Sequence, residues 1–273
     1  MTKAKYTVTN VARLVNRKQP KLERKISRIL SVAGKSIAQK IKTLYTKKMG
    51  KADLSSEDQA IIDAILSELE LSEVSIDIID SISPELIRAY KAAGILGVEQ
   101  VGINADEKMI AHLDRAALDY AENRAGELIK DLTETSESDL KDIISRAIED
   151  GISSDELSSN IEDMGIFSES RSTMIARTEL AFAHVQGNVK GWRETGMVEG
   201  KQSILGDLHS IEDECDDCVA AGIVPLDEDF IPGYDFPPYH PNCICDVLPV
   251  LMKETNEQDE SDQQDEDNQG ESE

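Results

Sequence analysis

Apolar residues recur every three or four positions through most of the chain, and this period predicts a mainly helical protein. The first helix is expected to begin after Pro20, because proline is favoured in a first helical turn and leucines and isoleucines follow it on one face. Ser55 and Ser56 are typical helix caps, and Ser83-Pro84-Glu85 predicts the start of another helix. Further helices are expected over 105–131, 138–150, 154–163 and 168–195.

The predicted helix over 168–195 has an apolar stripe, ending at Trp192, that we assign to a core. Arg177 and Glu179 are two positions apart and lie on different helix faces, so each is expected to pair with another element or with water. His184 stands alone, which is more typical of a surface histidine, or of one satisfied by hydrogen bonds, than of a ligand.

The pattern changes after Gly196. Six of the eight prolines and all four cysteines lie between residues 200 and 250, and two short runs, over 198–205 and 244–250, resemble strands. A segment with so many turns and so few apolar residues is expected to lack a core of its own, and it needs a cross-link to hold one shape.

The cysteines supply a candidate for that cross-link. Cys215-x2-Cys218 is followed by His240, Cys243 and Cys245, and such thiolates and an imidazole are the donors that tetrahedral zinc takes in structural sites. Five candidates compete for four places, so Cys243, Cys245 or His240 could be spare. Two disulfides, or four reduced cysteines packed as small apolar groups, are the alternatives, and the absence of an export signal disfavours disulfides.

These features predict a mainly α protein: a helical body with a small C-terminal α+β module stapled by zinc, and a disordered acidic tail. The expected domains are a basic amphipathic arm over 1–51, the helical body over 52–165, the module over 166–252 and the tail over 253–273. No apolar run approaches the roughly 20 residues that cross a bilayer, and no apolar secretion core follows the first lysines. We expect a soluble protein that stays where it is made, with no membrane partner.

Charge divides the chain more sharply than apolar pattern does. Lys and Arg total 29 against 54 Asp and Glu, for a net charge of −25. Residues 1–51 hold 15 of the bases and one acid, whereas residues 254–273 hold ten acids and no base. This tail has no apolar residue to bury, so we expect it to be disordered. A solubilising role is favoured over mimicry of DNA.

The basic side chains of the arm are candidate binding residues. They suit DNA phosphates, an anionic membrane surface, an acidic protein or the acidic body of the same chain. Only Tyr6 and Tyr45 could stack on bases there, which argues against sequence-specific recognition of single strands. The candidates are Lys21, Arg24, Lys25, Arg28, Lys35, Lys40 and Lys42.

Enzyme motifs are missing from the sequence. It contains no His-Glu-x-x-His, no Gly-x-Ser-x-Gly and no glycine-rich dinucleotide fingerprint. With four or five soft ligands available, the metal would be closed to substrate, so we expect no enzymatic activity. A metal-dependent hydrolase using His209 or Asp207 is the weakest alternative.

Several of these motifs resemble one family. Ile175-Ala-Arg-Thr-Glu179, the helix that ends at Gly196, Cys215-x2-Cys218 and Pro237-Pro-Tyr-His-Pro-Asn-Cys-Ile-Cys245 are similar to the Mu F-like head morphogenesis, or minor capsid, proteins of tailed bacteriophages. The resemblance covers about residues 140–250. This chain departs from the family where it has Ser203-Ile-Leu205 in place of an aromatic residue, and Ile244 in place of an arginine.

The resemblance implies a protein built into the phage procapsid in few copies beside the portal vertex. It would lie in the capsid interior of the virion, and in the host cytoplasm during assembly. Its expected partners are the portal protein, the scaffold or major capsid protein, and packaged DNA through the basic arm. The competing interpretation is a stand-alone zinc module that binds nucleic acid through that arm.

Overall fold

The computed structural model describes residues 9–49, 58–206, 209 and 212–252. The tail over 253–273, which the sequence predicts to be disordered, lies outside these residues. Ser55, Ser56 and Asp207 lie outside them as well. Within the described part, no helix combines the length and the apolar character needed to cross a bilayer.

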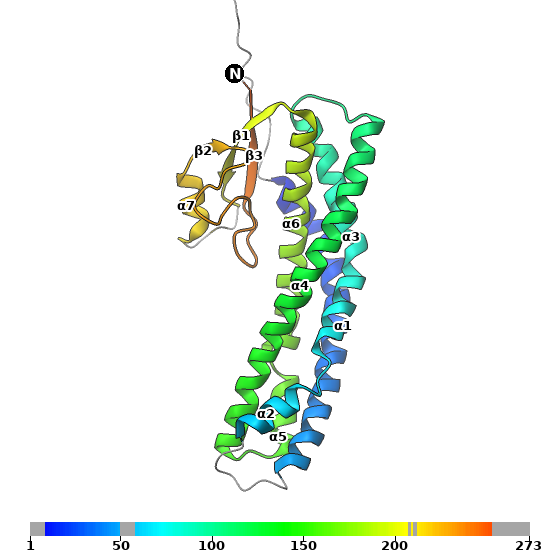
Figure 1. Ribbon diagram of the computed structural model, residues 1–273, viewed down its shortest axis with the longest axis vertical. Coiled ribbons are helices and arrows are strands. Elements are labelled where there is room, and N and C mark those ends of the chain that lie inside the picture. Colours follow the sequence, from blue (N-terminus) through cyan, green and yellow to red (C-terminus); the bar gives the residue numbers. More distant parts are fainter. Residues whose placement is uncertain (1–8, 50–57, 207–208, 210–211, 253–273) are drawn as a thin grey trace, which may run out of the picture.

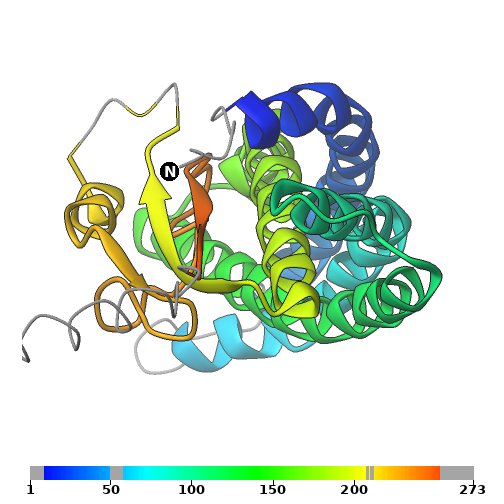
Figure 2. The same ribbon diagram turned by 90° about the horizontal axis from the view of Figure 1, so that it is seen from above.

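Four long helices run side by side in an elongated bundle (Figure 1). Two short helices and a 3-10 turn cover one end of the bundle, and a small sheet packs beside α6 toward the other end (Figures 1 and 2). The long helices are α1 (Thr9–Met49), α3 (Leu71–Gln100), α4 (Glu107–Asp150) and α6 (Glu169–Thr195). The short elements are α2 (Asp58–Leu66), α5 (Ser154–Glu162) and η1 (Gly165–Phe167). The expectation of a mainly helical protein with a small C-terminal sheet is confirmed.

The sheet belongs to a lobe that we define as residues 197–252. Its strand order is β2-β1-β3, and the central strand β1 (Val198–Ile204) is antiparallel to β2 (Ile223–Pro225) and β3 (Asp246–Leu251). The predictions of β1 and β3 are confirmed. β2 and the helix α7 (Glu214–Ala220) were not predicted, because each is too short to show a period and α7 is mostly acidic at its start.

Two helices continue through prolines that the sequence predicts to be helix starts. α1 begins at Thr9, well before Pro20, and α3 runs without a break through Pro84. Pro20 is exposed, so the carbonyl that loses its N–H partner lies on the solvent side of the helix. Pro84 is exposed as well, and so is Asp80, whose carbonyl loses its N–H partner there. These two predicted starts are wrong because solvent can satisfy the interrupted backbone at both prolines.

α4 is one helix, although the sequence predicts two, over 105–131 and 138–150. The polar stretch between them stays helical because its hydroxyls bond to the helix backbone. Thr135 and Ser136 each donate to the carbonyl four residues earlier, both at 2.7 Å. Such bonds satisfy side chains that would otherwise compete for backbone groups outside a helix.

The boundaries of two later helices agree closely with the sequence. α5 and α6 match the predictions over 154–163 and 168–195, and Ser153 and Ser168 cap them through their hydroxyls. Gly151 and Gly196 end α4 and α6 with φ values of 66° and 64°, a conformation that other residues adopt at a cost.

α6 is the central helix of the molecule. From Arg171 to Trp192 no residue of α6 is exposed, because α1, α3, α4 and the lobe all pack on it. Its approach to α3 depends on glycine: a Cβ added at Gly191 would lie 2.1 Å from the Gly94 carbonyl oxygen, and one at Gly187 would lie 2.3 Å from that of Tyr90. The two backbones therefore touch, and side chains larger than hydrogen do not fit at these positions.

The main apolar cluster is continuous between the bundle and the lobe. It includes Trp192 of α6 together with residues of the lobe such as Val198, Phe230 and Val247. The expectation that the lobe lacks a core is therefore wrong. Its few apolar residues are sufficient because they share the core of the bundle. A second cluster fills the end near α2 and α5, and a third small cluster contains three cysteines of the lobe.

Candidate metal centre and basic helix face

α7 positions the first pair of cysteines. It begins at a capping box, in which the Asp213 side chain accepts from the Cys215 backbone N–H at 2.9 Å. In return, the Asp216 carboxylate accepts from the Asp213 backbone N–H at 3.1 Å. This cap fixes the first turn of a helix that is too short to be stable alone. Cys215 and Cys218 are both completely buried but lie in different clusters.

The second pair of cysteines enters through a turn before β3. The Cys243 N–H donates to the His240 carbonyl at 3.1 Å, and Asn242 between them has a positive φ of 66°. The Asn242 N–H also donates to the Thr178 hydroxyl at 3.0 Å, which ties this turn to α6. Cys243 and Cys245 are 3% and 2% exposed, so both thiols point inward from the same segment.

Cys215 lies at the centre of two overlapping groups of donor atoms. It forms one group with His240 and Cys243 and another with His209 and Cys245, and the donor atoms of each group all lie within 4.8 Å of one another. We call these five residues the cysteine cluster. Four of them were predicted from the sequence. His209 was predicted only as a residue of a hydrolase, because it precedes the Cys-x2-Cys motif in the sequence. The fold brings its ring close to Cys215 and Cys245.

The structure does not bring Cys218 to the cysteine cluster. Cys218 belongs to the main apolar core, where its thiol is in hydrogen-bond contact with the Tyr239 hydroxyl. Tyr239 in turn donates to the Ser203 hydroxyl at 3.0 Å. Burial raises the pKa of the Cys218 thiol, as expected for a packed side chain that stays protonated.

The thiols of the cysteine cluster are electrostatically coupled. A hydrogen bond from Cys245 lowers the pKa of Cys243 to about 5. Burial raises the pKa of the Cys215 thiol, and the hydrogen bond to Cys243 raises that of Cys245. These shifts favour the thiolate form of Cys243 and the protonated forms of Cys215 and Cys245. A divalent ion would favour the thiolate form of all three.

The sulfur spacing suits a tetrahedral ion. Cys215 Sγ and Cys243 Sγ are 3.6 Å apart. Two sulfurs bound to one zinc at about 2.3 Å lie about 3.8 Å from each other. A disulfide would require about 2.05 Å, and all four cysteines are free thiols. The donor set therefore fits a metal without large movement.

Both histidines of the cluster have carboxylates behind them. His209 Nε2 lies 2.8 Å from Asp216 Oδ2, and this hydrogen bond raises the pKa of His209. His240 Nδ1 lies 2.8 Å from the Pro241 carbonyl oxygen, whereas its buried Nε2, 3.3 Å from Asp213 Oδ2, has no hydrogen-bond partner among the described residues. Carboxylates in this position commonly orient histidines toward a metal. In the described residues His209 is engaged through Nε2, which leaves Nδ1 for a ligand bond.

The basic candidates on α1 divide into paired and unpaired side chains. Lys21 pairs with buried Glu85 of α3, and three others are engaged elsewhere: Lys25 donates to the Ser81 carbonyl at 2.9 Å, Lys40 lies 3.1 Å from Glu70, and Lys42 pairs with Asp155. Arg24, Arg28 and Lys35 are exposed and have no acidic partner in the described residues. Arg24 makes one local bond, to the Pro20 carbonyl.

Arg13 and Arg17 are further exposed cations that sequence reasoning missed. The predicted start after Pro20 left them outside the helix, whereas α1 continues through them. Neither has an acidic partner in the part of the chain that the structure describes. The signal that could have found them is their spacing, which continues that of Arg24 and Arg28.

Charged side chains inside the bundle have structural partners. Arg124 of α4 makes two bonds to Glu179 of α6, at 2.8 and 2.9 Å, and stacks over the Phe182 ring at 4.4 Å. The prediction that Glu179 pairs with another element is confirmed. His184 is buried and bonded to Asn188 at 3.0 Å, and burial lowers its pKa to about 4, which agrees with a satisfied histidine.

Comparisons with known proteins place part of the chain in one family. Residues 138–248 match the family model described as phage Mu protein F like protein. No curated protein and no solved structure matches the chain. The matched stretch contains the end of α4, all of α6, every cysteine and the first half of β3. Proteins of this family are structural components of the phage head rather than enzymes. Residues 138–248 are therefore similar to the phage Mu protein F-like family.

Proposed function

We propose that the protein is a minor head protein of a tailed phage, built into the procapsid beside the portal vertex. The observation that carries this proposal is the Mu F-like domain over 138–248, whose motif residues the fold gathers around α6 and the lobe. In this role it acts in procapsid assembly and in the packaging or ejection of DNA. It has no catalytic activity of its own, and it resides in the capsid interior.

The partner of first choice is the portal protein. The exposed basic residues of α1 suit an acidic surface, and the bundle buries the opposite face of that helix. Scaffold protein, major capsid protein and packaged DNA are the other partners that this face can meet. Co-expression with the portal protein of the same phage, followed by nuclease treatment and size-exclusion chromatography, tests the choice. Co-elution with portal rings is expected; separation after nuclease treatment would mean that DNA, and not portal, holds the protein.

A second candidate function is favoured by the exposed arginines alone. In that case the protein is a stand-alone zinc module that binds nucleic acid through α1. Its affinity for duplex DNA would fall steeply with salt, because each phosphate contact releases counterions. Serine substitutions at Arg24 and Arg28 would reduce both affinity and salt slope, whereas serine at Lys130, an exposed cation on α4, would not.

We further propose that the cysteine cluster holds one structural zinc ion. Cys215, Cys243 and Cys245 would bind through sulfur, and the fourth donor would be His209, through Nδ1, or His240, whose buried Nε2 has no hydrogen-bond partner among the described residues. Zinc would supply a closed tetrahedral cross-link between α7 and the segment before β3. Bound metal measured on His209→Ala and His240→Ala proteins distinguishes the two histidines: the variant of the true ligand is expected to lose affinity far more, and full retention of zinc by both variants would contradict a histidine ligand.

A further inference from the structure

Five exposed cations of α1 form one continuous line, which we call the basic stripe. They are Arg13, Arg17, Arg24, Arg28 and Lys35. At 3.6 residues per turn their spacing of four and seven positions keeps all five within about 60° of the helix circumference, over a length of about 33 Å. None of the five has an acidic partner among the described residues. The stripe is thus a long, regular cationic surface without a counter-charge in the part of the chain that the structure describes.

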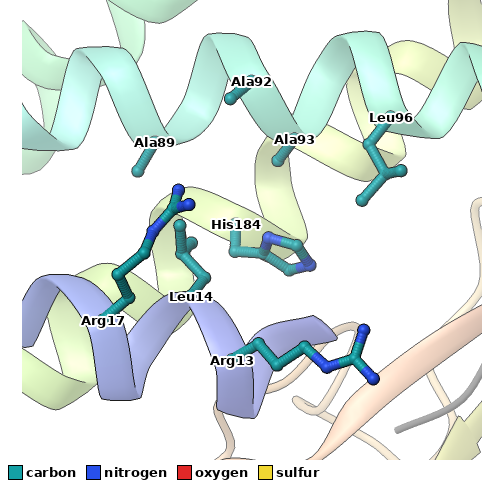
Figure 3. Close-up of a pocket in the computed structure, with 8 residues that line it drawn as sticks. All are labelled: Arg13, Leu14, Arg17, Ala89, Ala92, Ala93, Leu96 and His184. Carbon is teal, nitrogen blue, oxygen red and sulfur yellow. The ribbon is translucent and has the colours of Figure 1, made fainter. Parts of the chain in front are cut away.

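The stripe ends at a hollow between three helices. Arg13 and Arg17 border a cavity of about 480 Å³, whose floor is made by alanines of α3 and whose inner wall includes His184 of α6 (Figure 3). Figure 3 shows the two guanidinium groups at the side of the cavity that α1 contributes. The rim is therefore cationic and the floor apolar. An anionic chain can pair with the rim without entering the cavity.

The chain carries its own candidate counter-charge. Residues 254–273 contain ten acidic side chains, no base and no apolar residue. Residues 52–253 hold 43 acids against 14 bases, so most of the molecule repels this tail. The region over 1–51, with 15 bases and one acid, attracts it. Charge complementarity therefore selects α1 among the surfaces of the protein.

The position and length of the tail allow this contact. The tail follows β3, whose last residue, Leu251, pairs with Val198 directly after α6, and the lobe lies beside the half of the bundle in which α1 begins (Figures 1 and 2). An extended chain over 254–273 spans up to about 66 Å, twice the length of the stripe. Covalent attachment also gives the tail an effective concentration in the millimolar range.

We propose that residues 254–273 bind along the basic stripe of the same molecule and compete with external polyanions for it. The individual pairs lie on the surface and are weak, so the contact is reversible and sensitive to salt. Duplex DNA, with one charge per about 1.7 Å, displaces the tail when enough of it is present. The contact does not depend on which partner α1 binds in the head.

Zero-length carbodiimide cross-linking of the full chain tests the contact directly. Lys35 lies on the stripe, and Lys47 is another exposed lysine of α1 about 120° away from it. At low salt, monomeric protein is expected to give tail cross-links at Lys35 at least fivefold more often than at Lys47, and 0.5 M salt should abolish the difference. Equal yields at the two lysines, or tail cross-links only in dimers, would overturn the proposal.

A double-mutant cycle on DNA affinity tests the competition. In one variant the acids of 254–273 become Asn and Gln; in a second, Arg17, Arg24 and Arg28 become serine; a third combines both sets. Neutralising the tail is expected to tighten duplex DNA binding at least tenfold when the stripe is intact, and less than twofold when it is not. An equal gain in both backgrounds would show that the tail acts only through net charge, and the proposal would fail.

Discussion

The bundle and the lobe hold their shapes in different ways. The bundle buries rows of leucine and isoleucine between long helices, and it pairs the buried carboxylates Glu85 and Glu179 with cations. The lobe has short elements, two of them too brief to predict, and gathers thiols and imidazoles at a point of its own. Apolar packing stabilises the bundle, whereas the lobe also depends on its thiol and imidazole groups. Substitutions that disturb apolar packing should therefore destabilise the bundle more than the lobe, and loss of metal should destabilise the lobe more than the bundle.

The separation is not complete, because the lobe shares the main core. Phe230, Phe236 and Val247 belong to the same apolar cluster as the bundle, and Lys201 is buried over the Phe236 ring at 3.7 Å with its ammonium bonded to the Asp235 carbonyl. Loss of a metal should therefore loosen α7 and the cysteine-bearing turn rather than unfold the lobe as a whole. The following variants test this division, beginning with the largest expected effect.

The two cysteines of α7 offer a matched pair for the metal. Cys215→Ser removes the donor common to both groups of the cysteine cluster, so bound zinc is expected to fall from one ion per chain to none. The associated loss of stability in the lobe is up to about 10 kcal/mol, the lower end of structural zinc sites. Elemental analysis, with hydrogen exchange resolved between lobe and bundle, measures both effects.

Cys218→Ser is the control for that experiment. Cys218 is equally buried but contacts Tyr239 in the main core, so its variant is expected to keep zinc and to lose only about 1–2 kcal/mol from packing and hydrogen bonding. Equal loss of metal from the two variants would place Cys218 among the ligands. Absence of zinc from gently purified, reduced wild-type protein would contradict the proposal that the cysteine cluster holds a metal ion.

The buried ion pair of the bundle gives the second largest effect. Glu179→Leu leaves Arg124, which is only 16% exposed, without its bidentate partner, and should lower the free energy of unfolding by about 3–5 kcal/mol. Glu127, the other acid at Arg124, is 67% exposed, so Glu127→Leu should cost less than about 1 kcal/mol. Urea unfolding monitored through Trp192 measures both. Similar losses in the two variants would show that burial does not decide the strength of these pairs.

Backbone contact between α3 and α6 comes third. The added methyl of Gly191→Ala would lie 2.1 Å from a backbone oxygen, and the resulting overpacking should cost about 1–3 kcal/mol. Gly126→Ala is the control, because nothing lies within 4 Å of its added Cβ and alanine favours the helix. That variant should gain about 0.5–1 kcal/mol. A destabilised Gly126 variant, or an unaffected Gly191 variant, would contradict the close approach.

The bundle was more predictable than the lobe for a physical reason. Amphipathic periods identify helices, and hydroxyl caps and glycines mark their ends, as Ser168 and Gly196 do for α6. The sequence did not show that Pro20 and Pro84 lie inside helices, because the solvent exposure that compensates for each missing N–H is a property of the folded state. Local spacing therefore predicted elements well and their continuity poorly.

For the cysteine cluster, spacing predicted the region but could not assign every donor. Cys-x2-Cys places two sulfurs within reach of one ion, yet the orientation of α7 turns Cys218 toward the main core. His209 enters through a loop, and only the bond to Asp216 reveals its place. Choosing among nearby donors needs the direction of each side chain, which depends on contacts far away in the sequence.

The smallest expected effect concerns Glu85, a polar contact between α1 and α3 at the heart of the bundle. Lys21 and Arg88 lower the pKa of Glu85 from 4.5 to about 2, so its ionised form is bound more tightly in the folded state. The resulting stability is present above about pH 4.5 and is lost as the pH falls toward 2. Because Lys21 and Arg88 are 58% and 60% exposed, the contribution is about 1–2 kcal/mol.

Glu85→Gln should therefore be less stable than wild type at pH 7 and equally stable near pH 2, with the difference closing between those values. Urea unfolding across that range measures the difference, and Glu122→Gln, at an exposed position of α4, should follow the wild-type curve throughout. If the Glu85 difference persists unchanged at low pH, the side chain stabilises the bundle by packing rather than by charge. The stability of the bundle would then depend on packing even at its most polar contact. The difference from the lobe, where thiol and imidazole groups contribute, would be larger.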